Sequence, residues 1–333
     1  MGGSPSFPIS PIAKDRIFII TGANTGIGYE IAKWSAMMGA TVILACRSED
    51  RARKAMETMQ EEFKTEKAKG TMGLTDSPIL AIEFMKLDLA SFQSVVEFCE
   101  EFKKSGRQLH VLFCNAGLGF GSYKQTGDGL EIMLQVNYLS HFIIIAKLLS
   151  IMRRSGSDCR IVLTSSSAHK GGTFDLATMN YTGTAGNFPG LNYYGRSKLY
   201  QIMQAFAMSR RLKDSNVTIN SMHPGFVDSE LFRDADTCIE KCCLRCFRTC
   251  GVMKNTLEGA TTGIDLATNP KHTGVSGHYW ASCKVTTQSS TSRDEQKQEK
   301  LWKETFPFIQ KYLTEEEITY LEEKSQDHLR LEI

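Results

Sequence analysis

Short apolar runs alternate with helix-like segments along most of this chain. An apolar run over 17–20 is followed by a glycine-rich turn, by a segment with helical spacing over 27–38, and by a second apolar run over 41–45. A strand that is apolar throughout is typical of a sheet covered on both faces, and helices between such strands indicate parallel pairing with right-handed crossovers. The pattern predicts an α/β fold with a single doubly wound parallel sheet and helices on both of its faces.

The alternation continues to residue 222 without a linker that would divide it. Further helices are expected over 51–67, 92–103, 131–152 and 194–213, and further strands over 82–87, 109–113, 160–164 and 217–222. Residues 14–333 are therefore expected to form one domain behind a leader, 1–13, that is expected to be disordered. The C-terminal region, 294–333, is expected to hold charged helices over 299–305 and 315–329, interrupted by Pro307.

Composition and charge limit what the protein is expected to bind and where it is expected to be found. The 333 residues include 39 basic and 37 acidic ones, and a formal net charge of +2 gives no sustained positive field, so we expect a small-molecule substrate and no nucleic acid. We expect no membrane-spanning helix, which needs roughly 18 apolar residues, and the leader lacks the apolar core of a secretory signal. These features favour a cytoplasmic protein, in which the ten cysteines are expected to be reduced thiols.

Three glycines lie in the turn between the first strand and the first helix, which reads Thr21-Gly22-Ala23-Asn24-Thr25-Gly26-Ile27-Gly28. Glycines allow a pyrophosphate to approach the backbone, and the N-terminus of the helix that follows attracts its charge. We therefore expect a dinucleotide to contact Gly22, Asn24, Thr25, Gly26, Ile27 and Gly28. The spacing differs from the generic G-x-G-x-x-G, and a tight turn without a ligand is the alternative.

Arg47 follows the second strand, where folds of this class bind the adenosine ribose of a dinucleotide. An acidic residue there would accept a hydrogen bond from a free 2′-hydroxyl, whereas an arginine suits a 2′-phosphate. The run 45–48 contains Arg47 and no acidic residue, which favours NADP(H) over NAD(H) as the cofactor. An exposed arginine without a ligand is the alternative.

Tyr194 and Lys198 are four residues apart on a predicted helix, so their side chains share one face. A phenol is a poor base near neutral pH, but a nearby ammonium group and an oxidised nicotinamide both favour the phenolate, which can exchange a proton with an alcohol or a carbonyl. The spacing alone also fits an ordinary amphipathic helix. Its place in the chain favours catalysis, because Asn115-Ala116-Gly117 and 165–167 each follow an earlier strand, where open α/β sheets place their ligand crevice.

In these motifs the chain resembles the short-chain dehydrogenase/reductase family, over about 14–302. The family pattern T-G-x-x-x-G-x-G is matched by 21–28, its N-A-G by 115–117, its helix asparagine by Asn137, and its P-G by Pro224-Gly225. The resemblance implies a Rossmann-type fold and a catalytic tetrad of Asn137, Ser166, Tyr194 and Lys198. Ser166 is chosen by aligning the end of the preceding strand with the family, and its neighbours Ser165 and Ser167 remain alternatives.

The resemblance also implies roles for these residues. In the family the serine orients the substrate oxygen, the lysine holds the nicotinamide ribose and lowers the pKa of the tyrosine, and the asparagine holds a water in a proton relay. The further cofactor contacts that it implies are Asp88, Asn115, Ala116, Gly117, Tyr194, Lys198, Pro224, Gly225, Val227 and Ser229.

Within the family the chain is most similar to retinol dehydrogenases and to the catalytic domain of the WW-domain-containing oxidoreductase. The segments that carry this similarity are 45–47, 137–142, 166–169, 196–199 and 223–225. The resemblance implies hydride transfer between nicotinamide and a lipophilic alcohol or carbonyl, such as a retinoid, a steroid or a related aldehyde or ketone. A cofactor-binding scaffold or regulatory protein with little turnover is the alternative, and a homodimer also remains open.

Five cysteines crowd into 238–250, inside a stretch, 226–255, where family members carry a substrate lid. A single C-x-x-C without a second pair at zinc-site spacing argues against a metal site, so no metal is expected. Basic residues beside these cysteines suit a membrane surface with S-acylation, and the N-terminal Met1-Gly2-Gly3-Ser4-Pro5-Ser6 matches an acylation pattern. Peripheral membrane contact is therefore one expectation, beside a plain amphipathic lid and an unmodified leader.

Overall fold

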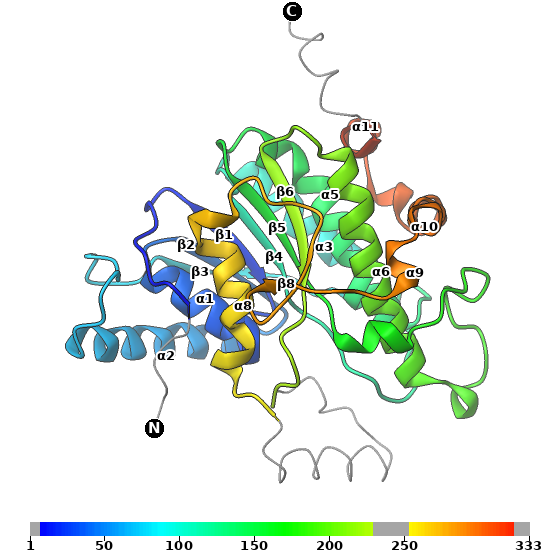
Figure 1. Cartoon of the computed structure of the whole chain (residues 1–333), viewed down its shortest axis with the longest axis horizontal. Coiled ribbons are helices and arrows are strands. Elements are labelled where there is room, and N and C mark those ends of the chain that lie inside the picture. The colour runs from blue at the N-terminus through cyan, green and yellow to red at the C-terminus, as the bar shows by residue number, and fades with distance from the viewer. Residues whose placement is uncertain (1–6, 229–252, 323–333) are drawn as a thin grey trace, which may run out of the picture.

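A computed structural model of the protein describes residues 7–228 and 253–322. A twisted eight-stranded sheet runs through its centre in the order β3-β2-β1-β4-β5-β6-β7-β8 (Figure 1). Its strands are β1 (Ile17–Thr21), β2 (Thr41–Cys46), β3 (Ile82–Lys86), β4 (Val111–Cys114), β5 (Cys159–Thr164), β6 (Val217–Met222), β7 (Tyr279–Ala281) and β8 (Lys284–Val285). All neighbouring pairs are parallel except β7 and β8. The predicted doubly wound parallel sheet is confirmed, with one short antiparallel strand added at its edge.

Helices cover both faces of this sheet, as Figure 1 shows. One face packs against α1 (Gly26–Met37), α2 (Glu49–Ala68) and α8 (Thr256–Thr268), and the other against α3 (Phe92–Lys104), α5 (Ser140–Arg153) and α6 (Gly190–Arg211). The C-terminal helices α10 (Glu295–Ile309) and α11 (Glu315–Glu322) lie outside α6 and α5. The shorter helical turns are α4 (Ile132–Leu134), α9 (Ser290–Arg293), and 3-10 turns over Ser167–Gly171, Ala185–Asn187, Pro270–His272 and Gln310–Tyr312.

The segment expected as one helix over 131–152 contains a wider turn. It begins with α4, continues as a π-helix over Gln135–Leu139, and then becomes α5. A π-turn accommodates an extra residue per turn and is frequent at functional sites. The stretch Ile132–Arg153 is long and apolar enough to cross a membrane, contrary to the expectation from the sequence, but 94% of its most apolar window is buried inside the protein. It is therefore a core helix in this fold.

The prediction of a disordered leader over 1–13 is wrong for its second half. The Phe7 ring packs edge-on against Trp34 of α1, with ring centroids 5.3 Å apart, and only 6% of Phe7 is exposed. Further on, the backbone N–H of Ile12 donates to the carbonyl oxygen of Met38 at 2.7 Å. Burial of these side chains against α1 offsets the cost of ordering a short segment that has no secondary structure of its own. Residues 1–6 lie outside the described part of the chain.

Pro307 does not interrupt the C-terminal helix, which is a second correction. The proline lies inside α10, close to its end at Ile309, so it removes a hydrogen bond only from the last turn. Buried side chains on both sides of it, Leu301, Trp302, Thr305 and Ile309, hold the helix against α6. Tertiary packing thus overrides the local preference of proline.

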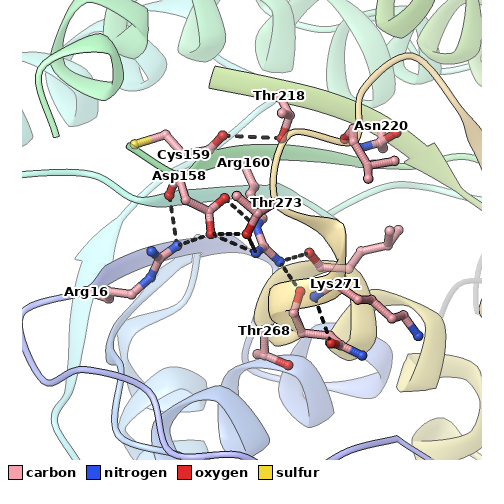
Figure 2. Close-up of polar contacts among 12 residues, drawn as sticks. Arg16, Asp158, Cys159, Arg160, Thr218, Asn220, Thr268, Lys271 and Thr273 are labelled. Carbon is pink, nitrogen blue, oxygen red and sulfur yellow. Dashed lines mark hydrogen bonds and ion pairs between the residues drawn. The ribbon is translucent and has the colours of Figure 1, made fainter. Parts of the chain in front are cut away.

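A buried arginine joins the sheet to α8 at the edge where the parallel strands begin (Figure 2). Arg160 of β5 is 4% exposed, and its Nε and Nη2 atoms donate to the Asp158 carboxylate at 2.8 and 2.7 Å. Its Nη1 donates to the carbonyl oxygens of Leu266 and Asn269 at the end of α8, both at 2.9 Å. Burial acts to raise the pKa of Asp158, but the hydrogen bonds and charge of Arg160 outweigh it and leave that pKa lowered.

We predict that Arg160→Met destabilises the fold, because the Asp158 carboxylate and the helix-terminal carbonyls then lose a buried partner. The expected loss in free energy of unfolding is about 3 kcal/mol. Urea unfolding followed by circular dichroism measures it. The matched control is Arg53→Met, which breaks a pair with Glu49 in which both side chains are more than half exposed, and a change within about 0.5 kcal/mol is expected there. Equal losses in the two variants would contradict this account of Arg160.

Candidate active site

A cavity of about 790 Å³ opens where the six strands β1 to β6 end. Most residues predicted to bind cofactor or substrate line it: Gly22, Asn24, Thr25, Gly26, Ile27, Arg47, Asp88, Asn115, Ala116, Gly117, Ser166, Tyr194, Lys198, Pro224, Gly225 and Val227. Gly28 and Asn137 are not among its lining residues. Ser229 lies outside the described residues, as does the cysteine-rich segment 238–250. The structure therefore gathers residues from six strand ends into one hollow, as the resemblance implies.

The glycine loop leaves room for a group that would lie against its backbone. Gly22 and Gly26 have φ angles of +65° and +62°, which favour glycine, and α1 begins at Gly26. A Cβ atom on Gly22 would come within 2.9 Å of the Cβ of Ala116. The loop after β4 therefore packs directly on the Gly22 backbone, and α1 begins at the cavity with Gly26 among the lining residues. This cradle fits the pyrophosphate of a dinucleotide.

Thr21 connects the glycine loop to the end of β4. Its Oγ1 accepts hydrogen bonds from the backbone N–H groups of Asn115 and Ala116, both at 2.9 Å, and its carbonyl oxygen accepts one from Asn115 Nδ2 at 3.1 Å. The same Oγ1 lies 3.0 Å from Nε2 of His141, a fully buried residue of α5. Sequence reasoning did not single out His141. Its position four residues after Asn137 on the same helix face was the available signal.

Two arginines, rather than one, line the cavity where β2 ends. Arg47 is exposed there, and Arg51 from the first turns of α2 lines the same wall with Ser48. Arg51 was missed in the sequence, although its spacing of four residues from Arg47 at a helix start suggests a shared face. On the opposite side, Asp88 accepts a hydrogen bond from the Ala90 N–H at 3.0 Å, which holds its carboxylate beside the cavity.

Tyr194 and Lys198 project from α6 at the centre of the cavity wall, and each is less than 5% exposed. The Lys198 Nζ atom donates to the carbonyl oxygen of Thr164 at 2.8 Å and to Gln201 Oε1 at 3.1 Å. It lies 5.9 Å from the centroid of the Tyr194 ring. Lysine and tyrosine thus share a wall, and the ammonium is fixed by the end of β5.

The three consecutive serines after β5 have different surroundings. Ser165 is buried, and its hydroxyl donates to the backbone oxygen of Lys198 at 2.8 Å, whereas Ser167 is exposed. Ser166 is half-buried, its Oγ accepts from the Ala168 N–H at 3.1 Å, and its side chain lies near enough to Tyr194 to act toward lowering the pKa of the phenol. Geometry therefore favours Ser166 over its neighbours as the partner of the tyrosine.

Burial opposes ionisation of both catalytic candidates. It raises the pKa of Tyr194 to about 12, although the nearby Ser166 side chain acts to lower it, and it lowers the pKa of Lys198 to about 7. The expectation that the lysine lowers the pKa of the tyrosine is therefore not met by the protein groups alone, because desolvation is the larger effect. A phenolate at neutral pH would need further positive charge beside it, such as an oxidised nicotinamide.

Asn137 lies in the π-turn, behind the cavity wall. Its Nδ2 donates to the carbonyl oxygen of Leu118 at 3.0 Å and to Ser197 Oγ at 2.9 Å, while its Oδ1 accepts from the Leu118 N–H at 2.8 Å. The side chain thereby joins the loop after β4 to α6, the helix that carries Tyr194 and Lys198. Its role in a proton relay stays a prediction.

The region that holds these site residues also matches known proteins. A family model described as short chain dehydrogenase matches residues 16–238. The chain belongs to the short-chain dehydrogenase family. Retinol dehydrogenase 14 of Mus musculus is 35% identical over 301 residues, which cover 90% of this chain and 86% of that protein. The WW domain-containing oxidoreductase of Gallus gallus is 36% identical over 295 residues, which cover 86% of this chain and 66% of that protein.

Solved structures agree on the fold. The crystal structure of an uncharacterized protein from Mycobacterium paratuberculosis has a TM-score of 0.70 and 23% identity, and the match covers 92% of this chain and 98% of that one. This short-chain dehydrogenase therefore resembles retinol dehydrogenases in sequence and has the Rossmann-type sheet of its family. Within the described ranges, 7–228 and 253–322, no group of three or more metal-binding side chains is found.

We predict that Gly28→Ala weakens dinucleotide binding. The added Cβ would lie 2.5 Å from the Gly22 carbonyl oxygen and would also meet Asn115 Nδ2, so the glycine loop must move away from α1. The expected result is an increase of at least about tenfold in the Kd for NADPH, a loss of 1.4 kcal/mol, measured by NADPH fluorescence. The control is Gly127→Ala, whose Cβ would meet no atom within 4 Å. A Kd for Gly28→Ala that equals that of the control would contradict the close fit of this loop.

Proposed function

We propose that this short-chain dehydrogenase is an NADP(H)-dependent oxidoreductase that transfers hydride between nicotinamide and a lipophilic alcohol or carbonyl. The observation that carries the proposal is the meeting of Tyr194 and Ser166 in one cavity whose other end is the glycine loop. Both residues line the same hollow from different elements, so one substrate oxygen could contact both hydroxyls. This arrangement supports proton transfer at an oxygen bound to the carbon that is oxidised or reduced.

The residues of the chain would divide this work as follows. Gly22, Gly26 and the start of α1 would hold the pyrophosphate, and Asp88 and Asn115 would border the adenine and the nicotinamide half. The cofactor, when bound, accepts or supplies the hydride. Ser166 Oγ would orient the substrate oxygen by a hydrogen bond, while the Tyr194 hydroxyl would give it a proton in reduction and take one in oxidation.

Lys198 would bind the nicotinamide ribose from the floor of the cavity. Its Nζ atom uses only part of its donor capacity on Thr164 and Gln201, because an ammonium carries three N–H groups. The position of Nζ beside the Tyr194 ring would also stabilise a phenolate. This support adds to that from the positive nicotinamide, against the burial that raises the tyrosine pKa.

The part of the cavity beyond Tyr194 supports a lipophilic substrate. Its walls include the apolar side chains of Leu118, Phe120, Ile132, Met133, Leu191 and Phe226. The Phe120 ring lies edge-on to Tyr194, with centroids 6.2 Å apart, and Leu191 is 62% exposed beside the opening. Apolar walls with a few placed hydroxyls suit a molecule that is hydrophobic except at its reacting oxygen. The names of the relatives, retinol dehydrogenases among them, support the same class.

We predict that Tyr194→Phe abolishes most turnover because the proton donor is lost. NADPH consumption would be followed with retinal, a steroid ketone and an aliphatic aldehyde, and kcat/KM is expected to fall at least about a hundredfold for each substrate that the parent reduces. The control is Tyr200→Phe, a buried tyrosine on the same helix whose hydroxyl accepts from Arg196 outside the cavity. Equal rates in the parent and in Tyr194→Phe would overturn the catalytic assignment.

We predict that Arg47→Asp reverses the cofactor preference. Replacing a cation that would face the 2′-phosphate with a carboxylate should raise the Kd for NADPH, relative to that for NADH, at least about tenfold. Arg51 retains part of the positive charge, so binding of NADPH should weaken without vanishing. Arg53→Asp, an exposed charge change in α2, the helix that follows Arg47, serves as the control. If the ratio of the two Kd values is the same in all three proteins, Arg47 does not select the cofactor.

A further inference from the structure

His169 is buried directly behind the proposed catalytic serine. It is 1% exposed and lies in the 3-10 turn Ser167–Gly171, which starts where Ser166 caps the Ala168 N–H. Its Nδ1 atom is 2.6 Å from the carbonyl oxygen of Ser166, a closer contact than the 3.1 Å bond that the His169 backbone N–H makes to the same oxygen. The imidazole therefore touches the peptide group that carries the serine side chain.

The other nitrogen of this ring fixes its tautomer. The backbone N–H of Ser289 donates to His169 Nε2 at 3.1 Å, so Nε2 must be the unprotonated nitrogen. The proton of a neutral imidazole then lies on Nδ1 and points at the Ser166 carbonyl oxygen. Burial also lowers the pKa of His169, which favours the neutral ring. A segment 120 residues further along the chain thus determines the direction of the hydrogen bond at Ser166.

Aromatic side chains pack beside the His169 imidazole and limit its rotation. Tyr279 of β7 packs edge-on against His169, with centroids 5.1 Å apart, and its hydroxyl oxygen lies 3.5 Å from Nδ1. His223 stacks on the far side of Tyr279, with centroids 6.3 Å apart. The imidazole is thereby held between β5, β7 and the segment before α9, in one orientation.

We propose that His169 is a positioning residue, which holds the Ser166 peptide through its Nδ1–H and so keeps the Ser166 hydroxyl in hydrogen-bonding reach of Tyr194. The proposal rests on the function proposed above. It adds a residue outside the tetrad, and it gives Ser289 a defined role as the donor that orients the imidazole. Serine geometry matters because a reacting group displaced by about 1 Å can lose up to about a hundredfold in rate.

Two amide substitutions of His169 distinguish the role of Nδ1 from the role of Nε2. The amide nitrogen of asparagine is two bonds from Cβ, as Nδ1 is in histidine, whereas that of glutamine is three bonds away, as Nε2 is. His169→Asn can keep a donor toward Ser166, and His169→Gln keeps only a group near Ser289. We expect kcat to fall less than about threefold in His169→Asn and at least about tenfold in His169→Gln, with KM for the carbonyl changed little in both.

His272→Asn is the control for loss of a buried histidine. His272 is 4% exposed and is bound to Asp265 at the opposite edge of the sheet. A lower Tm with unchanged kcat is expected for this control, which separates general destabilisation from an effect on the serine. Equal losses of kcat in His169→Asn and His169→Gln, or none in either, would overturn the proposal.

A second pair of variants tests the tautomer without changing the histidine. Ser289 has φ −65°, which proline adopts without strain, so Ser289→Pro removes the N–H that donates to Nε2. Ser289→Ala is its match, because it loses the same hydroxyl but keeps the N–H. We expect kcat to be at least about threefold lower in Ser289→Pro than in Ser289→Ala. Equal kcat values would mean that the Ser289 bond does not position the site.

A spectroscopic measurement keeps the proposal testable if no carbonyl in the panel is reduced, an outcome that counts against the proposed function alone. The 15N chemical shifts of the His169 ring in the full chain report which nitrogen carries the proton. We expect a neutral ring protonated on Nδ1 at pH 7, and a shift of the proton toward Nε2 in Ser289→Pro. A ring protonated on Nε2 in the parent, or charged at that pH, would overturn the proposal whether or not the protein turns over.

Discussion

The hydroxyl group of Thr21 joins three parts of the fold that must stay in register for the cavity to exist. It accepts the N–H groups of Asn115 and Ala116 at the end of β4 and contacts His141 on α5. His141 in turn lies 3.3 Å, through Nδ1, from the carbonyl oxygen of Asn137 in the π-turn. The single hydroxyl hydrogen of Thr21 has two acceptors within reach, His141 Nε2 at 3.0 Å and the Phe113 carbonyl oxygen at 3.4 Å, and Thr21, His141 and Asn137 are fully buried. The glycine loop, the loop after β4 and the helix of Asn137 are therefore positioned by one connected set of hydrogen bonds.

Burial of the Tyr194 and Lys198 side chains has two opposite effects. It strengthens the contacts that orient Ser166 and Lys198, because hydrogen bonds are stronger away from water. It also disfavours the charged forms of Tyr194 and Lys198, as the direction of both pKa shifts shows. In the proposed function, a positive charge from the bound cofactor would offset this cost for the Tyr194 phenolate. This offset would couple proton transfer to the oxidation state of the bound dinucleotide.

Sequence patterns were enough to predict the features set by local periodicity and by compact motifs. The apolar runs located β1 to β6 within a few residues, and the glycine loop, Asn115 and Tyr194 came together as their order implied. The features that failed depend on contacts between distant segments. Phe7 is ordered only because Trp34 of α1 receives it, and the helix through Pro307 persists because buried residues on both sides of it pack on α6. Nothing in the sequence near either residue reports these partners.

Segments late in the chain are structural parts of the catalytic domain, although the family match ends at residue 238. Lys147 of α5 is 3% exposed, and a charge so buried is stable only with partners. Its Nζ atom lies 3.1 and 3.2 Å from the two carboxylate oxygens of Glu317 in α11, and 3.0 Å from Glu100. Removing α11 would leave this ammonium with a partner that is nearly half exposed. α8 makes a similar contribution, because its terminal carbonyl oxygens accept hydrogen bonds from the buried Arg160, so the core of the sheet depends on helices from the C-terminal part of the chain.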